Sequence, residues 1–219
     1  MAPFEVDWSE LPKDLLGSVL QRLPNVVDII RFSAVCTSWH SVAYDKSYSS
    51  APQLPWLMLP YKLGHEGKET RNFLNLSENK IYQIKLPEIR HSRCVGSSFG
   101  WLVILDRFCH ALLMNPFSGA IIHLPPTETF PDVLGVNGSK PSGEIDSYTI
   151  RRRESYREYS ISAARLRVEL MSKALVTADP LVDNNYMVVA IGFSGLAFCK
   201  AGADSWTQLD RPNLENGRL

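Results

Sequence analysis

The residues able to ligate a metal ion or attack a substrate are few and scattered. The five histidines form neither an H-x-x-x-H nor an H-E-x-x-H pattern, and the four cysteines contain no C-x-x-C pair. His110 and His123 flank one expected hairpin and could meet there, but no patterned third ligand accompanies them. We therefore expect neither a metal site nor a cofactor.

Two other stretches come near known catalytic or binding signatures. The GFSG motif at 192–195 is one residue short of a nucleophile elbow and falls where a hairpin turn is expected. The three arginines at 151–153 open a basic stretch that could bind phosphate or direct nuclear import. Glu154 and Glu158 interleave with it, which favours a solvated face. No P-loop or dinucleotide fingerprint occurs, so the sequence predicts a protein that is not an enzyme.

The composition narrows the classes of partner. Lys and Arg together number 23, as do Asp and Glu, so no net charge draws the chain to nucleic acid. The apolar runs are too short or too interrupted to cross a bilayer, which predicts no membrane partner. Widely spaced cysteines indicate reduced thiols, so we expect a location in the cytoplasm, the nucleus or both.

The elements begin with a short helical module, for which we predict the bounds 7–47. Apolar residues recur three or four positions apart from Leu11 to Leu23, Pro24 ends that helix, and two more short helices should follow. Three such helices are too small to bury their own apolar surface and are marginal in isolation. The module should therefore pack against the rest of the chain or against a partner protein.

The stretches "LPKDLLGSVLQRLP" and "VVDIIRFSAVCTSWHSVA" resemble an F-box. The resemblance implies docking onto the Skp-type adaptor of a cullin–RING ubiquitin ligase. The residues that it implies for that interface are Leu11, Pro12, Leu15, Leu16, Leu20, Leu23, Pro24, Val35, Cys36 and Trp39. For Val35, Cys36 and Trp39, packing in the module's own core remains an alternative to partner contact. Aspartate at Leu16 or Leu20 is expected to weaken adaptor binding by at least about 2 kcal/mol.

The remainder, residues 51–219, predicts short antiparallel strands and an overall α+β class. Short apolar runs predict strands with tight turns in two regions. The first lies between Arg71 and Pro126 and includes the SENK turn, and the second contains runs at 187–191, 196–200 and 206–209. They indicate two sheet units of the kind found in propeller blades. The stretch from Thr127 to Arg167 is expected to be mostly loop.

The segments "GWLVILD", "LLMNPFSGAIIHLPP" and "MVVAIGFSGLAFCKAGADSWTQLD" resemble the C-terminal domain of plant F-box proteins of the KIB type. The resemblance implies an incomplete, kelch-like propeller that recruits an unidentified target protein to the ligase. Relatives continue for several more blades, so an alternative stays open. A shortened chain could occupy the adaptor as a competitor without delivering a target.

Overall fold

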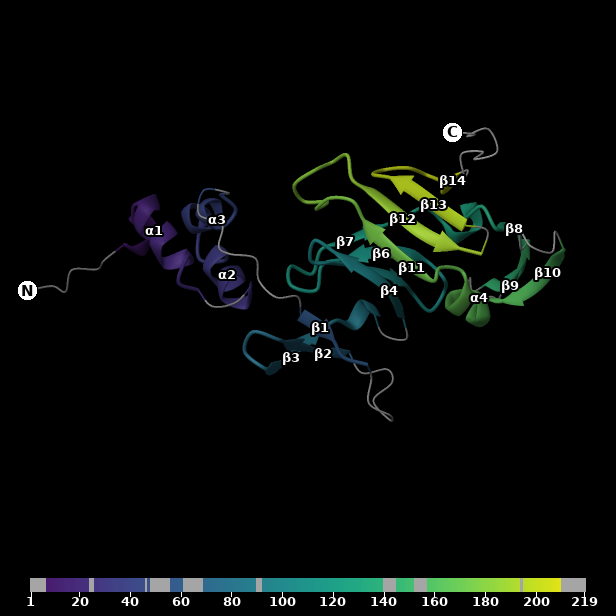
Figure 1. Cartoon of the computed structure of the whole chain (residues 1–219), viewed down its shortest axis with the longest axis horizontal. Helices are drawn as coiled ribbons and strands as arrows, with labels where there is room; N and C mark the ends of the chain where they lie inside the picture. The colour runs from purple at the N-terminus through teal and green to yellow at the C-terminus, as the bar shows by residue number, and fades with distance from the viewer. Residues whose placement is uncertain are drawn as a thin grey trace, which may run out of the picture. The chain divides into compact units, whose positions relative to one another are not determined.

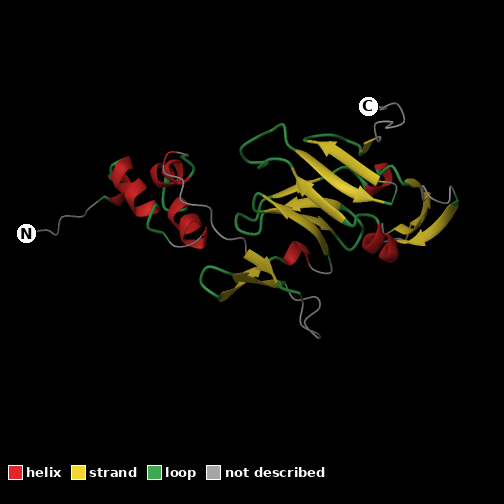
Figure 2. Cartoon of the chain, viewed as in Figure 1, coloured by secondary structure: helices red, strands yellow, loops and turns green. Residues whose placement is uncertain are grey.

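The computed structural model describes residues 7–23, 26–45, 47, 56–60, 69–89, 92–139, 145–151, 157–193 and 195–209 (Figure 1). Helices come first and antiparallel sheets follow (Figure 2), which confirms the predicted α+β class. The chain divides into two compact units, residues 1–60 with 72–83 and residues 61–71 with 84–219. The predicted boundary between 47 and 51 falls beside residues outside the described ranges, and it stays a prediction.

The helical module contains a short 3-10 turn and three short helices. They are η1 (Trp8–Glu10), α1 (Lys13–Leu20), α2 (Val26–Ser33) and α3 (Thr37–Ala43). The Asp7 carboxylate accepts hydrogen bonds from the backbone N–H and hydroxyl of Ser9, at 2.9 and 2.6 Å, and so caps η1. Both bonds lower the pKa of the Asp7 carboxyl, and the bond from the Ser9 hydroxyl has the larger effect. The first helix begins directly after Pro12, with Asp14 in its first turn, where a negative charge suits the helix dipole.

A three-stranded sheet follows, in the order β1-β2-β3. Its strands are β1 (Trp56–Met58), β2 (Thr70–Asn75) and β3 (Lys80–Lys85). The turn between β2 and β3 is the predicted SENK turn. Asn79 takes a left-handed backbone conformation there, with φ of 51°, which Asn tolerates better than most residues. A further 3-10 turn, η3 (Pro87–Ile89), comes after β3.

Two four-stranded antiparallel sheets confirm the two predicted sheet units. The first contains β4 (Arg93–Ser98), β5 (Trp101–Leu105), β6 (Ala111–Met114) and β7 (Ile121–His123). The second contains β11 (Lys173–Val176), β12 (Met187–Gly192), β13 (Gly195–Lys200) and β14 (Thr207–Leu209). In both sheets the spatial order of the strands is their order along the chain, which is the arrangement of a propeller blade.

The two sheets pack against one another and share a core. Val103, Leu105 and Leu113 of the first sheet lie in one cluster with Val188 and Ala190 of the second. The opening strands, β4 and β11, come especially close. A Cβ on Gly96 would overlap the carbonyl oxygen of Ala174, so only glycine fits there.

Two buried tryptophans tie the sheets together from opposite directions. The indole N–H of Trp101, at the start of β5, donates to the Asp179 carboxylate beyond β11 at 3.0 Å. The indole N–H of Trp206, just before β14, donates to the carbonyl oxygen of Pro125 beyond β7 at 3.1 Å. A buried indole N–H needs such a partner, so each sheet completes the polar contacts of the other.

The stretch from Thr127 to Arg167 differs from the predicted loop. It forms η4 (Thr127–Thr129), a sheet in the order β10-β9-β8, and the helix α4 (Ala163–Glu169). The strands are β8 (Val133–Ser139), β9 (Ile145–Arg151) and β10 (Glu158–Ser162). Tyr148, Ile150 and Ile161 from this sheet are buried in the shared core, and their burial stabilises strands that are otherwise rich in polar residues.

Candidate docking surface on the helical module

The three helices of the module enclose a small core of their own. Leu16 and Leu20 from α1 meet Phe32 from α2 and Val42 from α3, and all four are at most 5% exposed. Leu11, Leu23, Ile29, Trp39 and Ala43 pack partly buried around them. Among the described residues this core has four buried apolar side chains, a number at the lower limit for independent stability.

Trp39 joins the N-terminal turn to this core. Its ring lies 4.6 Å from that of Phe32, measured between centroids, and its indole N–H donates to the carbonyl oxygen of Trp8 at 2.9 Å. The bond spans 31 residues of chain and holds η1 against α3. Trp39 thus has a structural role, which supports the core-packing alternative, while part of its ring stays accessible.

The outward side of α1 carries apolar residues that the core does not use. Leu15 and Val19 are 54% and 43% exposed, and Pro12, one turn before them, is also exposed. Residues three and four positions apart on a helix lie on one face, so Pro12, Leu15 and Val19 form a single line, called here the α1 stripe. Such a line suits the helix-in-groove mode of protein recognition.

The ten residues expected at the interface separate by burial. Pro12, Leu15 and Val35 are exposed, Leu11, Leu23, Cys36 and Trp39 are half-buried, Leu16 and Leu20 are buried, and Pro24 lies outside the described residues. The two buried leucines support the surface from beneath instead of forming it. Aspartate at Leu16 or Leu20 would therefore disrupt the module's fold before it tested docking.

Three large, exposed apolar residues in the described part of the module were not among the expected contacts. Trp8 is 63% exposed, Tyr44 is 61% exposed, and Val19 belongs to the α1 stripe. The signal for Val19 was present in the sequence, because it stands four residues after Leu15. Nothing in the pattern marked Trp8 or Tyr44, which lie in a turn before α1 and at the end of α3.

The other sequence candidates acquire structural roles. His110 lies exposed with its Nδ1 at 3.1 Å from an Asp106 carboxylate oxygen, and no group of three or more metal-ligating residues occurs in the described ranges. Two residues of the GFSG motif, Gly192 and Gly195, pair with each other at the ends of β12 and β13, and Ser194 lies outside the described residues. Among the helices that the structure describes, none is both long and apolar enough to cross a membrane.

In the basic stretch, two arginines are paired with carboxylates. Arg151 contacts Glu158 and Arg165 contacts Glu169, each at 2.6 Å between nitrogen and oxygen. These exposed ion pairs agree with a solvated face. The arginines at 152 and 153 lie outside the described residues.

Comparison with known families matches both parts of the chain. Residues 8–48 match the F-box-like family, and residues 73–218 match the KIB1-4 beta-propeller family. The first range covers the three helices, and the second covers the two four-stranded sheets with the strands between them.

Individual relatives agree with the two family matches. The chain is 35% identical to F-box protein SKIP23 of Arabidopsis thaliana over 62% of its own length and 32% of that protein. It is 31% identical to probable F-box protein At4g22060 of the same plant over 91% of its length and 48% of that protein. Almost the whole chain is matched in such relatives, but it spans only about half of their length. It belongs to the KIB1-4 beta-propeller family, as a plant-type F-box protein whose helical module precedes its blade-like sheets.

Proposed function

We propose that the chain is the substrate-recognition subunit of a Skp-cullin-F-box ubiquitin ligase. In this role the helical module docks on a Skp-type adaptor, and the β region holds a target protein. The observation that carries the proposal is the exposure of Leu15 and Val19 on a module whose own core is already filled by Leu16, Leu20, Phe32 and Val42. The F-box-like match over residues 8–48 supports the same partner.

The function requires no catalytic group in this chain. A receptor that binds adaptor and target together raises the local concentration of the target near the ubiquitin-conjugating enzyme. The proposal includes a cytoplasmic or nuclear location. The four cysteines, Cys36, Cys94, Cys109 and Cys199, are all free, which suits a reducing compartment.

The docking half is tested by calorimetric titration of the full chain with a purified Skp-type adaptor. Leu15→Asp and Val19→Asp are each expected to weaken binding by about 30-fold or more, because a buried interface anchor contributes about 2 kcal/mol. Both residues are exposed in the free module, so neither change should reduce its helical circular dichroism.

Two control variants separate docking from folding. Leu181→Asp alters an exposed residue of the β region, 59% accessible, and should bind the adaptor as the wild type does. Leu16→Asp buries a charge in the module's core and should lose helicity and binding together. Wild-type affinity in folded Leu15→Asp and Val19→Asp would reject the α1 stripe as the docking face, and no binding by the wild type would reject the adaptor proposal itself.

The target half is tested in a ligase reconstituted with adaptor, cullin and RING subunits. A substrate receptor should promote ubiquitin transfer to a protein that it captures. If the chain instead only lowers transfer by a second F-box receptor, through competition for adaptor, the target half is rejected while adaptor docking stands.

A further inference from the structure

A cavity of about 300 Å³ lies in the β region beside the turn between β5 and β6. Three elements line it, namely that turn, the start of β9 and the start of α4. It is called here the turn cavity. All of its lining residues belong to the second of the two compact units, so the cavity is formed within one unit and is separate from the α1 stripe.

The turn beside the cavity is fixed by its own contacts. One Asp106 carboxylate oxygen accepts hydrogen bonds from the backbone N–H groups of Phe108 and His110, at 2.7 and 2.8 Å. Cys109 takes a left-handed backbone conformation, with φ of 70°, and its buried thiol donates to a backbone carbonyl oxygen at the start of α4, at 3.0 Å. A residue other than glycine keeps such a conformation only where its surroundings impose it. The turn therefore presents Arg107 and Phe108 in a fixed arrangement.

The lining combines a cation with apolar side chains. The Arg107 guanidinium is exposed and lies 4.4 Å from the centre of the Phe108 ring. A guanidinium that rests on a ring still presents the N–H groups at its edge, in a planar fork that matches a carboxylate. Ile145, Ala163 and Ala164 add apolar surface to the cavity. The lining thus fits a group that is apolar at one end and anionic at the other.

The size of the turn cavity suits one large side chain with a charged neighbour. An apolar cavity of about 150 Å³ holds a benzene ring. Sites for small molecules and cofactors run from about 300 to 1,000 Å³. The turn cavity stands at the lower end of that range. A short segment of another protein can supply the ring and the charge from adjacent residues.

Asp146 sets the orientation of the occupant. It is part of the lining, and its Oδ2 atom lies 2.8 Å from the position that a Cβ on Gly138 would take. A second carboxylate close to Asp146 would be repelled, whereas Arg107 would attract it. The anionic group of an occupant should therefore meet Arg107, and loss of the Asp146 charge should strengthen its binding.

We propose that the turn cavity binds a segment of the target protein in which an acidic residue stands next to a large apolar residue. The existence of a target rests on the proposed function, and the cavity adds its binding site and its chemistry. The apolar side chain packs against Phe108, and the carboxylate pairs with Arg107. Arginine and aromatic residues often dominate the binding energy of an interface. Because the turn is already fixed, little conformational entropy is lost on contact.

NMR titration of the full chain with capped tripeptides tests the site. A tripeptide with a phenylalanine between two glutamates should change the amide shifts of Phe108, Ser162 and Ala164, with a Kd of about 1 mM. Lysines in place of the glutamates should weaken binding by about tenfold or more, because they face Arg107. Phenylacetate should also bind more weakly than the glutamate tripeptide, because its carboxylate reaches less far from the ring.

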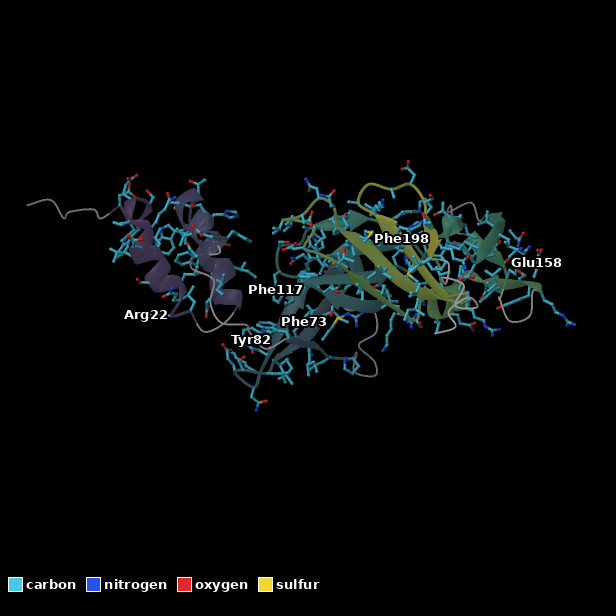
Figure 3. All side chains as sticks on the ribbon, turned by 45° about the horizontal axis from the view of Figure 1, so that its top comes forward. Arg22, Phe73, Tyr82, Phe117, Glu158 and Phe198 are labelled. Carbon is cyan, nitrogen blue, oxygen red and sulfur yellow. The ribbon has the colours of Figure 1, made fainter. Side chains whose placement is uncertain are left out.

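Three variants change the cavity, each at an exposed residue. Arg107→Met should weaken binding of the glutamate tripeptide by about tenfold or more, because it removes hydrogen bonds to a charged group. Ala164→Leu, which narrows the cavity, should weaken it as well, and Asp146→Asn should strengthen it by about twofold or more. Arg22→Met is the matched control, since Arg22 is an exposed arginine of the helical module (Figure 3), and should bind as the wild type does.

All four variants should keep native circular dichroism. Absence of shift changes at about 10 mM glutamate tripeptide, ten times the expected Kd, overturns the inference. So does wild-type affinity in Arg107→Met and Ala164→Leu, or equal binding of the lysine tripeptide. Phenylacetate that binds as tightly as the glutamate tripeptide would assign the cavity to a small acid instead of a protein segment. The titration uses neither adaptor nor ligase, so its failure leaves adaptor docking intact, and failed docking leaves its result intact.

Discussion

At the scale of single residues, the thiols of Cys109 and Cys199 are sealed inside the β region. They are 0% and 2% exposed, and burial raises the pKa of Cys109 to about 11 and that of Cys199 to about 12. A free thiol ionises near pH 8.5. The stability that these neutral thiols contribute is therefore present below about pH 8.5 and is lost as the pH rises toward 11 to 12.

This burial predicts a two-stage reaction with a maleimide. At pH 8 the partly accessible Cys36 should be modified first. Cys94 should follow more slowly, because burial raises the pKa of its thiol, and Cys109 and Cys199 should react only after denaturant is added. Mass spectrometry of the labelled chain at successive times gives the order. Early modification of Cys199 in the native protein would contradict the buried core.

Leu15 and Leu16 show what the sequence could and could not decide about the docking surface. The motif marked both leucines, yet one is 54% exposed and the other is fully buried. Neighbouring helix positions are about 100° apart around the axis, so the positions of α2 and α3 decide which of the two leucines is buried. The pattern therefore predicted the module and an apolar α1, but the side of α1 that faces outward depends on its tertiary packing with Phe32 and Val42.

At the scale of elements, the helix α4 depends on an arginine from a distant strand. Arg93 of β4 donates from Nη1 to the carbonyl oxygens of Val168 and Met171, at 2.6 and 2.7 Å. The last carbonyls of a helix have no partner within it, and a cation there also suits the helix dipole. A residue 75 positions earlier in the chain thus completes the end of α4.

Arg93→Met should lower the free energy of unfolding by about 1 to 3 kcal/mol, the range for losing hydrogen bonds to a charged group. Arg107→Met is the control, because the Arg107 guanidinium is exposed and lies 4.4 Å from the centre of the Phe108 ring. It should change stability by no more than about 0.5 kcal/mol. Urea unfolding followed by circular dichroism measures both, and equal effects would contradict the capping role.

The strands β8, β9 and β10 were missed from sequence for a physical reason. Their segments, VLGVNGS, IDSYTIR and EYSIS, contain turn-forming and polar residues that dilute the apolar signal. The alternation of Tyr148 with Ile150 was a usable sign, since both face the core. The hairpin at β12–β13 was easier, because continuous apolar runs flank a glycine-containing turn.

At the scale of the whole molecule, the approach of β4 to β11 fixes how the two large sheets meet. A methyl group at position 96 would meet the backbone of Ala174, which cannot rotate away as a side chain can. Gly96→Ala should therefore separate the sheets locally and destabilise the chain by about 1 to 3 kcal/mol.

Gly135→Ala provides the comparison, since nothing lies within 4 Å of the position that its Cβ would take. It should be neutral within about 0.5 kcal/mol, or slightly stabilising through the unfolded state. Differential scanning calorimetry compares the two variants. Equal melting temperatures for Gly96→Ala and the wild type would show that the sheets are less closely packed than described.

The two tryptophan hydrogen bonds between the large sheets also set the order in which parts of the chain can fold during translation. Each bond joins residues about 80 positions apart, so the first sheet can form these contacts only after the second sheet has left the ribosome. At ordinary rates of translation, about 100 residues take roughly 5 to 20 s. The three helices depend mainly on contacts close in sequence and can form first. A nascent chain could therefore offer its α1 stripe to an adaptor before its β region has folded.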